Sequence, residues 1–299
     1  MLHPAEYRGL PVLVLGLARS GQAVARLFHR LGAIVTVNDR KERALCPEAD
    51  ELEASGIRVV CGSHPAELVH SGVALVVKNP GIPYHAPPVA AAINLGIEVV
   101  TEVEVAWHLC RAPIIAVTGS NGKTTTTTWI GRMLERAGGR PVVAGNIGKP
   151  LSEACDGVSA DRWVVAELSS FQLKGTRDFR PRIACLLNIY ETHLDYHGTM
   201  DDYIESKMRL FANQTENDFA VLNRDNPLSR RAEERTKAQV IPFSVREELD
   251  FGLFLEGDSA GGVASGAGAR MIVWRDRDGR SVPILPAGEV GIPGRHNLE

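Results

Sequence analysis

A Gly-containing loop with one lysine and a pair of threonines carries the most specific chemistry in this sequence. It reads Thr118-Gly119-Ser120-Asn121-Gly122-Lys123-Thr124-Thr125, and it lies between an apolar run at 114–117 and a predicted helix at 126–137. Backbone N–H groups of such a loop and the positive end of the helix attract phosphate oxygens. In this pattern the lysine reaches the β- and γ-phosphates and the first threonine binds Mg²⁺. The sequence therefore predicts binding of ATP and Mg²⁺. The predicted nucleotide site comprises Gly119, Ser120, Asn121, Gly122, Lys123, Thr124 and Thr125.

The loop is shorter than the general P-loop pattern. That pattern has a glycine five positions before the second glycine, where this chain has Val117 and places its glycine at Gly119 instead. One alternative is a Gly/Thr-rich turn before an ordinary helix. The preceding strand, the lysine and the paired threonines, in that order, favour phosphate binding.

A carboxylate and a His-rich segment are the candidate metal ligands. Glu167 ends the apolar run 164–166, where an acid completes the Mg²⁺ site of many P-loop enzymes. An isolated glutamate at a strand end is often only solvated, but three polar side chains follow this one, which favours metal binding. The segment 188–198 holds two histidines and two acids without the spacing of a zinc site. His193 therefore indicates a phosphoryl contact or a hard-metal ligand.

A lysine further along the chain joins this group. Lys207 lies on a predicted helix at 200–212, where a lysine is most often a surface charge. It becomes a candidate site residue only in combination with Lys123, Glu167 and His193.

A second Gly-rich turn follows the first predicted strand. Gly16-Leu17-Ala18-Arg19-Ser20-Gly21 resembles a dinucleotide fingerprint with alanine in the middle position, and Asp39 closes the second strand. Three interpretations stay open: an NAD site, a tight turn that binds nothing, and a site for another nucleotide. The loop 78–83, Lys-Asn-Pro-Gly-Ile-Pro, follows another strand, and its location favours one site shared with the first turn.

The elements that must position these residues alternate along the chain. In the first hundred residues we expect strands at 12–15, 34–37, 58–61, 75–77 and 98–100, with a helix at 20–31. This alternation predicts a Rossmann-like parallel sheet covered by helices on both faces. A second α/β unit begins near 112, with further strands at 142–144, 163–166, 183–187, 220–222 and 240–243. Strands at 271–274 and 282–285 predict a small antiparallel element, and 294–299 looks like the start of a helix.

Length and composition restrict the class of protein. A chain of 299 residues is long enough for about two domains. The net charge of −3 excludes a broad basic footprint, so we expect no nucleic-acid partner. Five cysteines without a C-x-x-C pair indicate free thiols in a reducing cytosol. No apolar stretch predicts a signal peptide or a membrane span, and we expect a cytoplasmic protein.

Together, these motifs resemble those of the Mur ligases, the ATP-dependent amide-forming enzymes of peptidoglycan precursor synthesis, which serve cell wall biogenesis, cell shape and cell division. The family's shortened P-loop matches 118–125. Glu-Leu-Ser-Ser-Phe-Gln-Leu at 167–173 is similar to the branch that adds D-glutamate. The segments 78–84, 145–148 and 193–198 point the same way, and the resemblance spans the whole chain.

The resemblance implies a fold and a reaction. It implies a Rossmann-like UDP-substrate-binding domain at residues 1–103 and a central P-loop ATP-binding domain at 104–299. In the implied reaction, ATP phosphorylates the terminal carboxylate of UDP-N-acetylmuramoyl-L-alanine, and the amine of D-glutamate attacks the acyl phosphate. Lys123, His193 and Lys207 are the implied catalytic residues. The implied metal ligands are Thr124, Glu167, His193 and Lys207, the lysine as its CO₂ carbamate.

The resemblance also reassigns the first Gly-rich turn from NAD to the uridine diphosphate. The turn is expected to face the diphosphate, and Asp39 and Arg40 the uracil or ribose. The implied substrate-binding residues are Gly16, Ala18, Arg19, Ser20, Asp39, Arg40, Asn79, Gly81, Asn146, Ser169 and Gln172.

One departure from the family concerns a third domain, which binds the incoming amino acid. We expect this C-terminal domain, with the D-glutamate site, to be absent from the 299 residues. The 299-residue form is then expected to act as a monomer that binds the UDP-substrate, and ATP weakly, without ligating D-glutamate. A non-catalytic UDP-sugar-binding module and an NAD oxidoreductase with an accidental P-loop are the alternatives.

Overall fold

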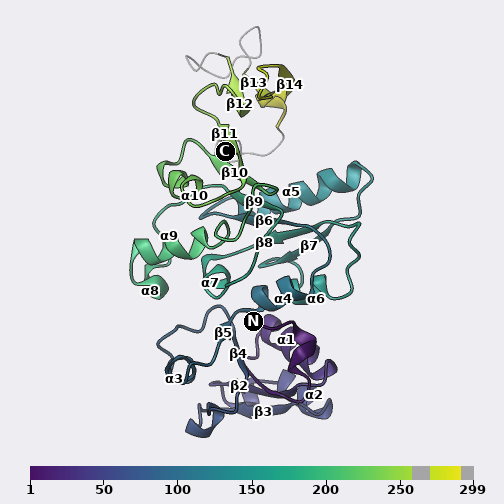
Figure 1. Cartoon of the computed structure of the whole chain (residues 1–299), viewed down its shortest axis with the longest axis vertical. Helices are drawn as coiled ribbons and strands as arrows, with labels where there is room; N and C mark the ends of the chain where they lie inside the picture. Colours follow the sequence, from purple (N-terminus) through teal and green to yellow (C-terminus); the bar gives the residue numbers. More distant parts are fainter. Residues whose placement is uncertain (258–269, 291–299) are drawn as a thin grey trace.

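The computed structural model describes residues 1–257 and 270–290. Two sheets lie one above the other along the long axis, the first in purple and blue and the second in teal to yellow (Figure 1). Strands β1–β5 make the first sheet and β6–β14 the second. The predicted α/β class, with a Rossmann-like unit before a P-loop unit, is confirmed. The start of a helix expected at 294–299 lies outside the described residues.

The first sheet has five parallel strands in the order β3-β2-β1-β4-β5. Its strands are β1 (Pro11–Leu15), β2 (Ile34–Asp39), β3 (Arg58–Cys61), β4 (Leu75–Lys78) and β5 (Val99–Val100). The helical segments are α1 (Arg19–Arg30), α2 (Glu48–Ala54), α3 (Pro87–Asn94) and the 3-10 turns η1 (Pro4–Tyr7), η2 (Arg43–Leu45) and η3 (Ala66–Leu68). Separate buried clusters cover the two faces, as the alternating pattern predicts.

The helix α1 forms where the spacing of apolar residues predicts a helix. Its apolar residues recur at helical spacing, and Val24, Leu27 and Phe28 are all buried against the sheet. The helix ends at Arg30, and Gly32 follows with a φ of +90°, a conformation that glycine adopts without strain. The observed range agrees with the expected one to within a residue.

The second sheet has nine strands in the order β14-β13-β12-β11-β10-β9-β6-β8-β7. They are β6 (Ile114–Thr118), β7 (Val142–Gly145), β8 (Val164–Glu167), β9 (Ile183–Leu186), β10 (Phe219–Asn223), β11 (Gln239–Ser244), β12 (Gly252–Glu256), β13 (Met271–Arg275) and β14 (Ser281–Pro286). The seven strands β6 to β12 pair with one another in parallel. The strand β13 pairs antiparallel with both β12 and β14.

The C-terminal strands differ from expectation in one respect. The predicted antiparallel hairpin is present, but it is not a separate element. The unpredicted strand β12 pairs in parallel with β11 and antiparallel with β13, and so joins the hairpin to the main sheet. Its apolar run, Leu253-Phe254-Leu255, is only three residues long, too short for a periodicity argument.

Helices cover the second sheet. They are α4 (Glu102–Leu109), α5 (Lys123–Arg136), α6 (Leu151–Cys155), α7 (Ser170–Leu173), α8 (Leu194–His197), α9 (Met200–Met208) and α10 (Arg230–Glu233), with 3-10 turns η4 (Pro227–Ser229) and η5 (Ala287–Glu289). The helix α5 starts three residues earlier than expected, at the P-loop lysine itself. The helix α9 ends at Met208, before the expected 212.

The helix α4 connects the two halves of the chain. Val105 belongs to the core of the first sheet, whereas Val103 and Ala106 belong to the core of the second. The predicted domain boundary between 103 and 104 falls within this helix and stays a prediction.

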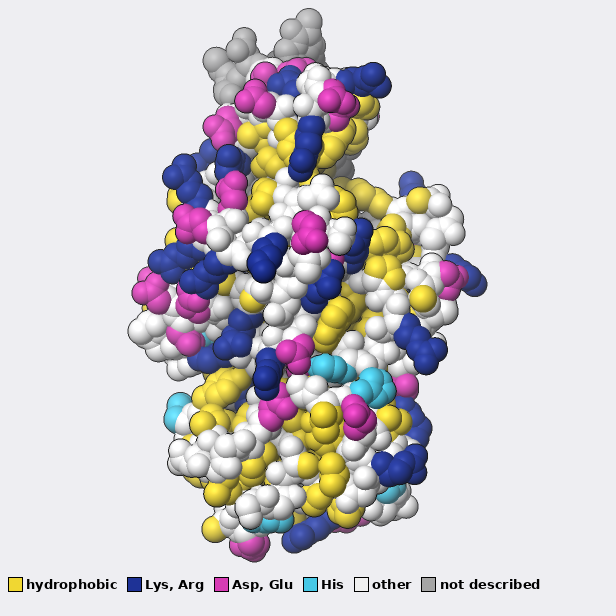
Figure 2. Space-filling view, viewed as in Figure 1, with side chains coloured by type: hydrophobic (Ala, Val, Ile, Leu, Met, Phe, Trp, Pro, Cys, Tyr) yellow, Lys and Arg dark blue, Asp and Glu magenta, His cyan; other side chains and the backbone are white. Residues whose placement is uncertain are grey.

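No helix among the described residues is long and apolar enough to span a membrane. Lysine, arginine and acidic side chains are interspersed on the face shown in Figure 2.

Candidate nucleotide and substrate site

The P-loop connects a buried strand to the start of α5. All residues of β6 are buried, and Gly122 turns the chain into the helix with a φ of +81°. Lys123 then opens the helix, whose first turn has no side-chain cap. The first N–H groups of an uncapped helix lack intrahelical partners and attract anions. The geometry fits a bound phosphate.

The P-loop lysine is turned toward its own loop. Lys123 Nζ donates to the carbonyl oxygens of Gly119 and Ser120, at 2.9 Å each. Burial lowers the pKa of the ammonium, and the charge of Glu167 opposes that shift. The ammonium of Lys123 is thus held at the loop, where phosphate oxygens would compete with these two carbonyl oxygens for its hydrogen bonds.

A residue that the sequence reasoning did not assign holds the loop in place. The Asn188 side chain accepts hydrogen bonds from the backbone N–H groups of Ser120 and Asn121, at 3.1 and 2.9 Å. The sequence predicts that the loop N–H groups point at phosphate. Two of them are instead used by Asn188, which leaves those at the start of α5. The position of Asn188, just after β9 and next to the P-loop strand, was the available signal.

The predicted magnesium ligands of this loop lie together. Glu167 is buried at the end of β8, and its Oε2 accepts a hydrogen bond from Thr124 Oγ1 at 2.7 Å. Its other oxygen accepts from Asn146 Nδ2 at 2.8 Å. A hydroxyl and a carboxylate are ligands that Mg²⁺ prefers. Asn146, expected at the substrate, contacts this carboxylate.

Lys207 is buried beside the same loop. Its side chain is 1% exposed, and Nζ donates to Gly119 O at 2.9 Å and Thr118 Oγ1 at 3.2 Å. Burial, with a smaller contribution from the charge of Lys123, lowers the pKa of Lys207 to about 7. An amine with this pKa is largely neutral at mildly alkaline pH, and the neutral form is the one that reacts with CO₂.

His193 is placed differently from the other candidate ligands. It is exposed, and its ring packs against Phe171 and Tyr203 at centroid distances of 4.9 and 6.3 Å. Its backbone φ of +58° is uncommon for a non-glycine residue and costs free energy. Tyr203 connects His193 to the P-loop, because its ring packs against His193 and its hydroxyl hydrogen-bonds Ser120 Oγ at 2.8 Å.

A chain of polar groups beneath Phe171 has the order of a Ser-His-Asp triad. His197 bonds Ser170 Oγ at 3.0 Å and Asp202 Oδ2 at 2.6 Å. Ser170 and His197 are both buried, and Phe171 stacks on the histidine ring at 5.4 Å. Because this burial denies a substrate access to the serine, the chain of bonds fixes α7 against α8 and α9 rather than forming a nucleophile.

A large cleft lies at the carboxyl edge of the first sheet. Its volume is about 790 Å³, and its lining includes Gly16, Ala18, Ser20, Asp39, Arg40, Asn79 and Gly81. Asn79 Oδ1 accepts from Ser20 Oγ at 2.7 Å and so connects the two predicted loops. A Cβ on Gly16 would lie 2.3 Å from the Asn79 side chain, so the close approach requires glycine. The carboxylate of Asp39 accepts the backbone N–H groups of Leu17 and Lys41.

A second cleft, of about 380 Å³, lies between the two sheets. Both carboxyl edges line it, with Ala18, Arg19, Ser20 and Gly81 on one side and Asn146, Ser169 and Gln172 on the other. Ser169 and Gln172 also form a reciprocal cap at the start of α7. The buried carboxyl of Glu102, whose pKa burial raises, lines this cleft as well and was not foreseen. The sequence pattern gave no signal for a buried acid at the start of α4.

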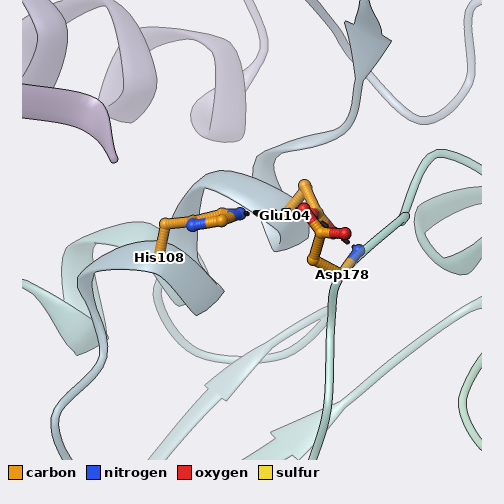
Figure 3. A group of neighbouring side chains, drawn as sticks. All are labelled: Glu104, His108 and Asp178. Atoms are coloured by element: carbon orange, nitrogen blue, oxygen red, sulfur yellow. Dashed lines mark hydrogen bonds and ion pairs between the residues drawn. The ribbon is translucent and has the colours of Figure 1, made fainter. Parts of the chain in front are cut away.

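A different acidic group lies away from these clefts. Among the described residues, Glu104, His108 and Asp178 are the one group of His, Cys, Asp or Glu side chains close enough to share a metal ion (Figure 3). However, the buried Glu104 carboxylate already accepts the N–H groups of Arg177, Asp178 and Phe179. The N-terminal ammonium pairs with Asp178. This group therefore joins α4 to the loop before β9.

Comparison with known proteins agrees with this architecture. Residues 11–101 match the N-terminal domain of MurD-like Mur ligases, and residues 117–299 match the Mur ligase middle domain. The chain belongs to the Mur ligase family.

Individual relatives show which members of the Mur ligase family this chain resembles. The chain is 48% identical to the UDP-N-acetylmuramoylalanine–D-glutamate ligase of Geobacillus sp. (strain WCH70) and 46% identical to that of Streptococcus mutans, over 100% of its own length in each case. It spans 62% of the length of both relatives. A solved ligase from Neisseria meningitides, UDP-N-acetylmuramate:L-alanyl-gamma-D-glutamyl-meso-diaminopimelate ligase, shares the fold with a TM-score of 0.58 at 20% identity, covering 96% of this chain and 89% of that one.

Proposed function

We propose that this chain supplies the UDP-substrate-binding and ATP-binding parts of an enzyme that joins D-glutamate to UDP-N-acetylmuramoyl-L-alanine. The named relatives support the substrates, and the position of the two clefts supports the chemistry. The 380 Å³ cleft brings the residues expected at the UDP-substrate within reach of the Asn146–Glu167 pair. A cytoplasmic location and a monomeric state stay predictions.

The proposed reaction activates a carboxylate. The terminal carboxylate of UDP-N-acetylmuramoyl-L-alanine attacks the γ-phosphorus of ATP, the bond to the β-phosphate oxygen breaks, and ADP leaves. The amine of D-glutamate then attacks the acyl phosphate, giving an amide and inorganic phosphate. Such a step needs fixed positive charge where phosphoryl charge develops. Lys123 and the N–H groups at the start of α5 supply it in this chain.

The metal would be held by oxygen atoms around the loop. Thr124 and Glu167 would bind one Mg²⁺, which neutralises phosphate charge when bound. His193 and carbamylated Lys207 would serve a second. The lowered pKa of Lys207 supports carbamylation, because CO₂ adds to the neutral amine and the product is a carboxylate-like oxygen ligand.

The observation that carries the proposal is the convergence of three groups on the P-loop. Lys123 and Lys207 both donate to Gly119 O, and Thr124 bonds Glu167. An ordinary Gly/Thr-rich turn has no need for a buried lysine, a second, partly buried lysine and a buried acid.

Calorimetric titration of this chain tests the proposal. We expect binding of UDP-N-acetylmuramoyl-L-alanine and of Mg²⁺ with a non-hydrolysable ATP analogue, and none of NAD. Lys123→Ala should remove the heat of the ATP analogue and leave that of the UDP-substrate, because the lysine lies in the second unit only. Binding of NAD in the 790 Å³ cleft, without the UDP-substrate, would contradict the proposal.

A further inference from the structure

A fully buried lysine ends β4, directly before the loop that lines both clefts. Lys78 is 0% exposed, and its Nζ donates to the carbonyl oxygens of Pro80 at 3.2 Å and Ile82 at 2.8 Å. It also lies 4.7 Å from the ring centroid of Tyr84. Burial lowers the pKa of Lys78 to about 7, and the charge of Lys174 adds to the shift. The reaction proposed above gives no role to the Lys78 ammonium, although its burial costs free energy.

A tyrosine from the other half of the chain meets the same lysine. Tyr196, 118 residues away on α8, accepts a hydrogen bond from Lys78 Nζ at 3.3 Å. Its hydroxyl donates to Pro80 O at 3.0 Å. One side chain from each half therefore holds the same short loop, at carbonyls that have no other side-chain donor among the described residues.

The ring of Tyr196 also contacts Phe171, the aromatic side chain against which His193 packs. The Tyr196 ring packs edge-on against Phe171 at 4.6 Å, and Phe171 packs against His193 at 4.9 Å. His193 is the residue before α8 and has a φ of +58°. Because that backbone is held by the packing of α8, a shift of α8 would reorient the His193 ring.

At its far end, the same loop reaches the predicted UDP site. Asn79 bonds Ser20, and Pro80 and Gly81 line both the 790 Å³ cleft and the 380 Å³ cleft. The loop 79–83 thus lies between the UDP-substrate cleft and α8, with Lys78 and Tyr196 at the junction.

We infer that Lys78 and Tyr196 are positioning residues that couple occupation of the UDP-substrate cleft to the placement of His193 at the nucleotide site. The inference rests on the proposed function. A ligand that orders the loop 79–83 also orders α8, and by linkage a ligand at the nucleotide site favours the same arrangement of the loop. A merely structural role would stabilise the fold without coupling the two ligands.

The coupling is measured by titrating UDP-N-acetylmuramoyl-L-alanine with and without a saturating non-hydrolysable ATP analogue and Mg²⁺. For the unmodified chain we expect the second ligand to tighten binding by about fivefold or more, the lower end of typical couplings. Tyr196→Phe removes one hydroxyl and keeps the ring against Phe171. It should reduce the coupling to below about twofold, while each ligand alone binds almost as before.

Tyr7→Phe is the matched control. Tyr7 is a buried tyrosine whose hydroxyl also bonds the backbone, at Leu2, but it packs in the first core away from both clefts. Its coupling should equal that of the unmodified chain. Lys78→Met is a second variant, and its thermal unfolding shows whether it has folded.

The possible outcomes are distinct. Loss of coupling in Tyr196→Phe with retention in Tyr7→Phe supports the inference. Unchanged coupling in Tyr196→Phe, or two ligands that bind the unmodified chain independently, overturns it and leaves the proposed function standing. If neither ligand binds the unmodified chain, the proposed function fails and the inference fails with it.

Discussion

At the scale of single residues, the site depends on what surrounds Gly119. Two lysines donate to its carbonyl oxygen, Lys123 from α5 and Lys207 from α9, each at 2.9 Å. Sequence reasoning found Lys123 because the loop pattern is local. It could give Lys207 a role only by family resemblance, because nothing in the spacing of a nine-residue helix distinguishes a buried lysine from a surface one.

The Thr124–Glu167 pair leads to a prediction about metal dependence. Glu167→Gln keeps the shape of the side chain but removes the charge that a divalent cation needs. We expect affinity for the ATP analogue to lose its dependence on Mg²⁺, with a weakening of about tenfold or more at saturating Mg²⁺, roughly the effect of one lost charged contact. Titrations with and without EDTA measure this. Equal Mg²⁺ dependence in Glu167→Gln and the unmodified chain would exclude Glu167 as a ligand.

The pKa of Lys207 leads to a prediction about pH. Its pKa is lowered from 10.5 to about 7 on folding, so between these values the unfolded chain binds more protons than the folded one. The penalty for burying the ammonium is therefore complete below pH 7, and stability rises as the pH increases from 7 to 10.5. The contribution is on the order of a few kcal/mol.

Lys207→Met removes this contribution. In CO₂-free buffer, we expect the midpoint of thermal unfolding to rise less between pH 7 and pH 10 in the variant than in the unmodified chain. The difference between the two proteins cancels other titrating groups. Parallel pH profiles would show that Lys207 titrates normally.

At the scale of elements, the parts that the sequence predicted are those with local patterns. The strands of the first sheet and α1 follow apolar runs with clear ends, and they form where expected. The strand β12 and the helix α4 were missed. The strand β12 has only three consecutive apolar residues. The helix α4 packs against the cores of both sheets, so its buried residues are consecutive instead of recurring at helical spacing.

The role of α4 is testable through Glu104. Its buried carboxylate accepts three backbone N–H groups of the loop 177–179. Figure 3 shows this carboxylate beside Asp178 of that loop. Glu104→Ala leaves these donors without a partner, and we expect a loss of about 3 kcal/mol or more in the free energy of unfolding. Urea denaturation measures it.

Glu53→Ala is the control for that experiment. Glu53 is exposed and pairs with Arg43 Nη2 at 2.6 Å, so its removal should leave the urea midpoint unchanged. If Glu104→Ala were as stable as Glu53→Ala, the connection through α4 would not depend on this carboxylate.

At the scale of the whole molecule, function depends on how two sheets face each other. Residues that follow β1 and β4 and residues at or after the ends of β7 and β8 line one cleft of 380 Å³. The sequence predicted each set, because ligands bind at the carboxyl ends of parallel strands. It could not predict that the two edges meet, since the contacts between Tyr196 and Pro80 or between Arg19 and Gly148 join residues more than a hundred positions apart.

A crystal structure of this chain with UDP-N-acetylmuramoyl-L-alanine, Mg²⁺ and the ATP analogue would test the central claim most directly. The account predicts the uridine diphosphate in the 790 Å³ cleft, the γ-phosphate at Lys123 and a metal ion between Thr124 and Glu167. The substrate carboxylate should extend through the 380 Å³ cleft toward that phosphate. Density for the substrate elsewhere, or a nucleotide that does not contact the P-loop, would contradict it.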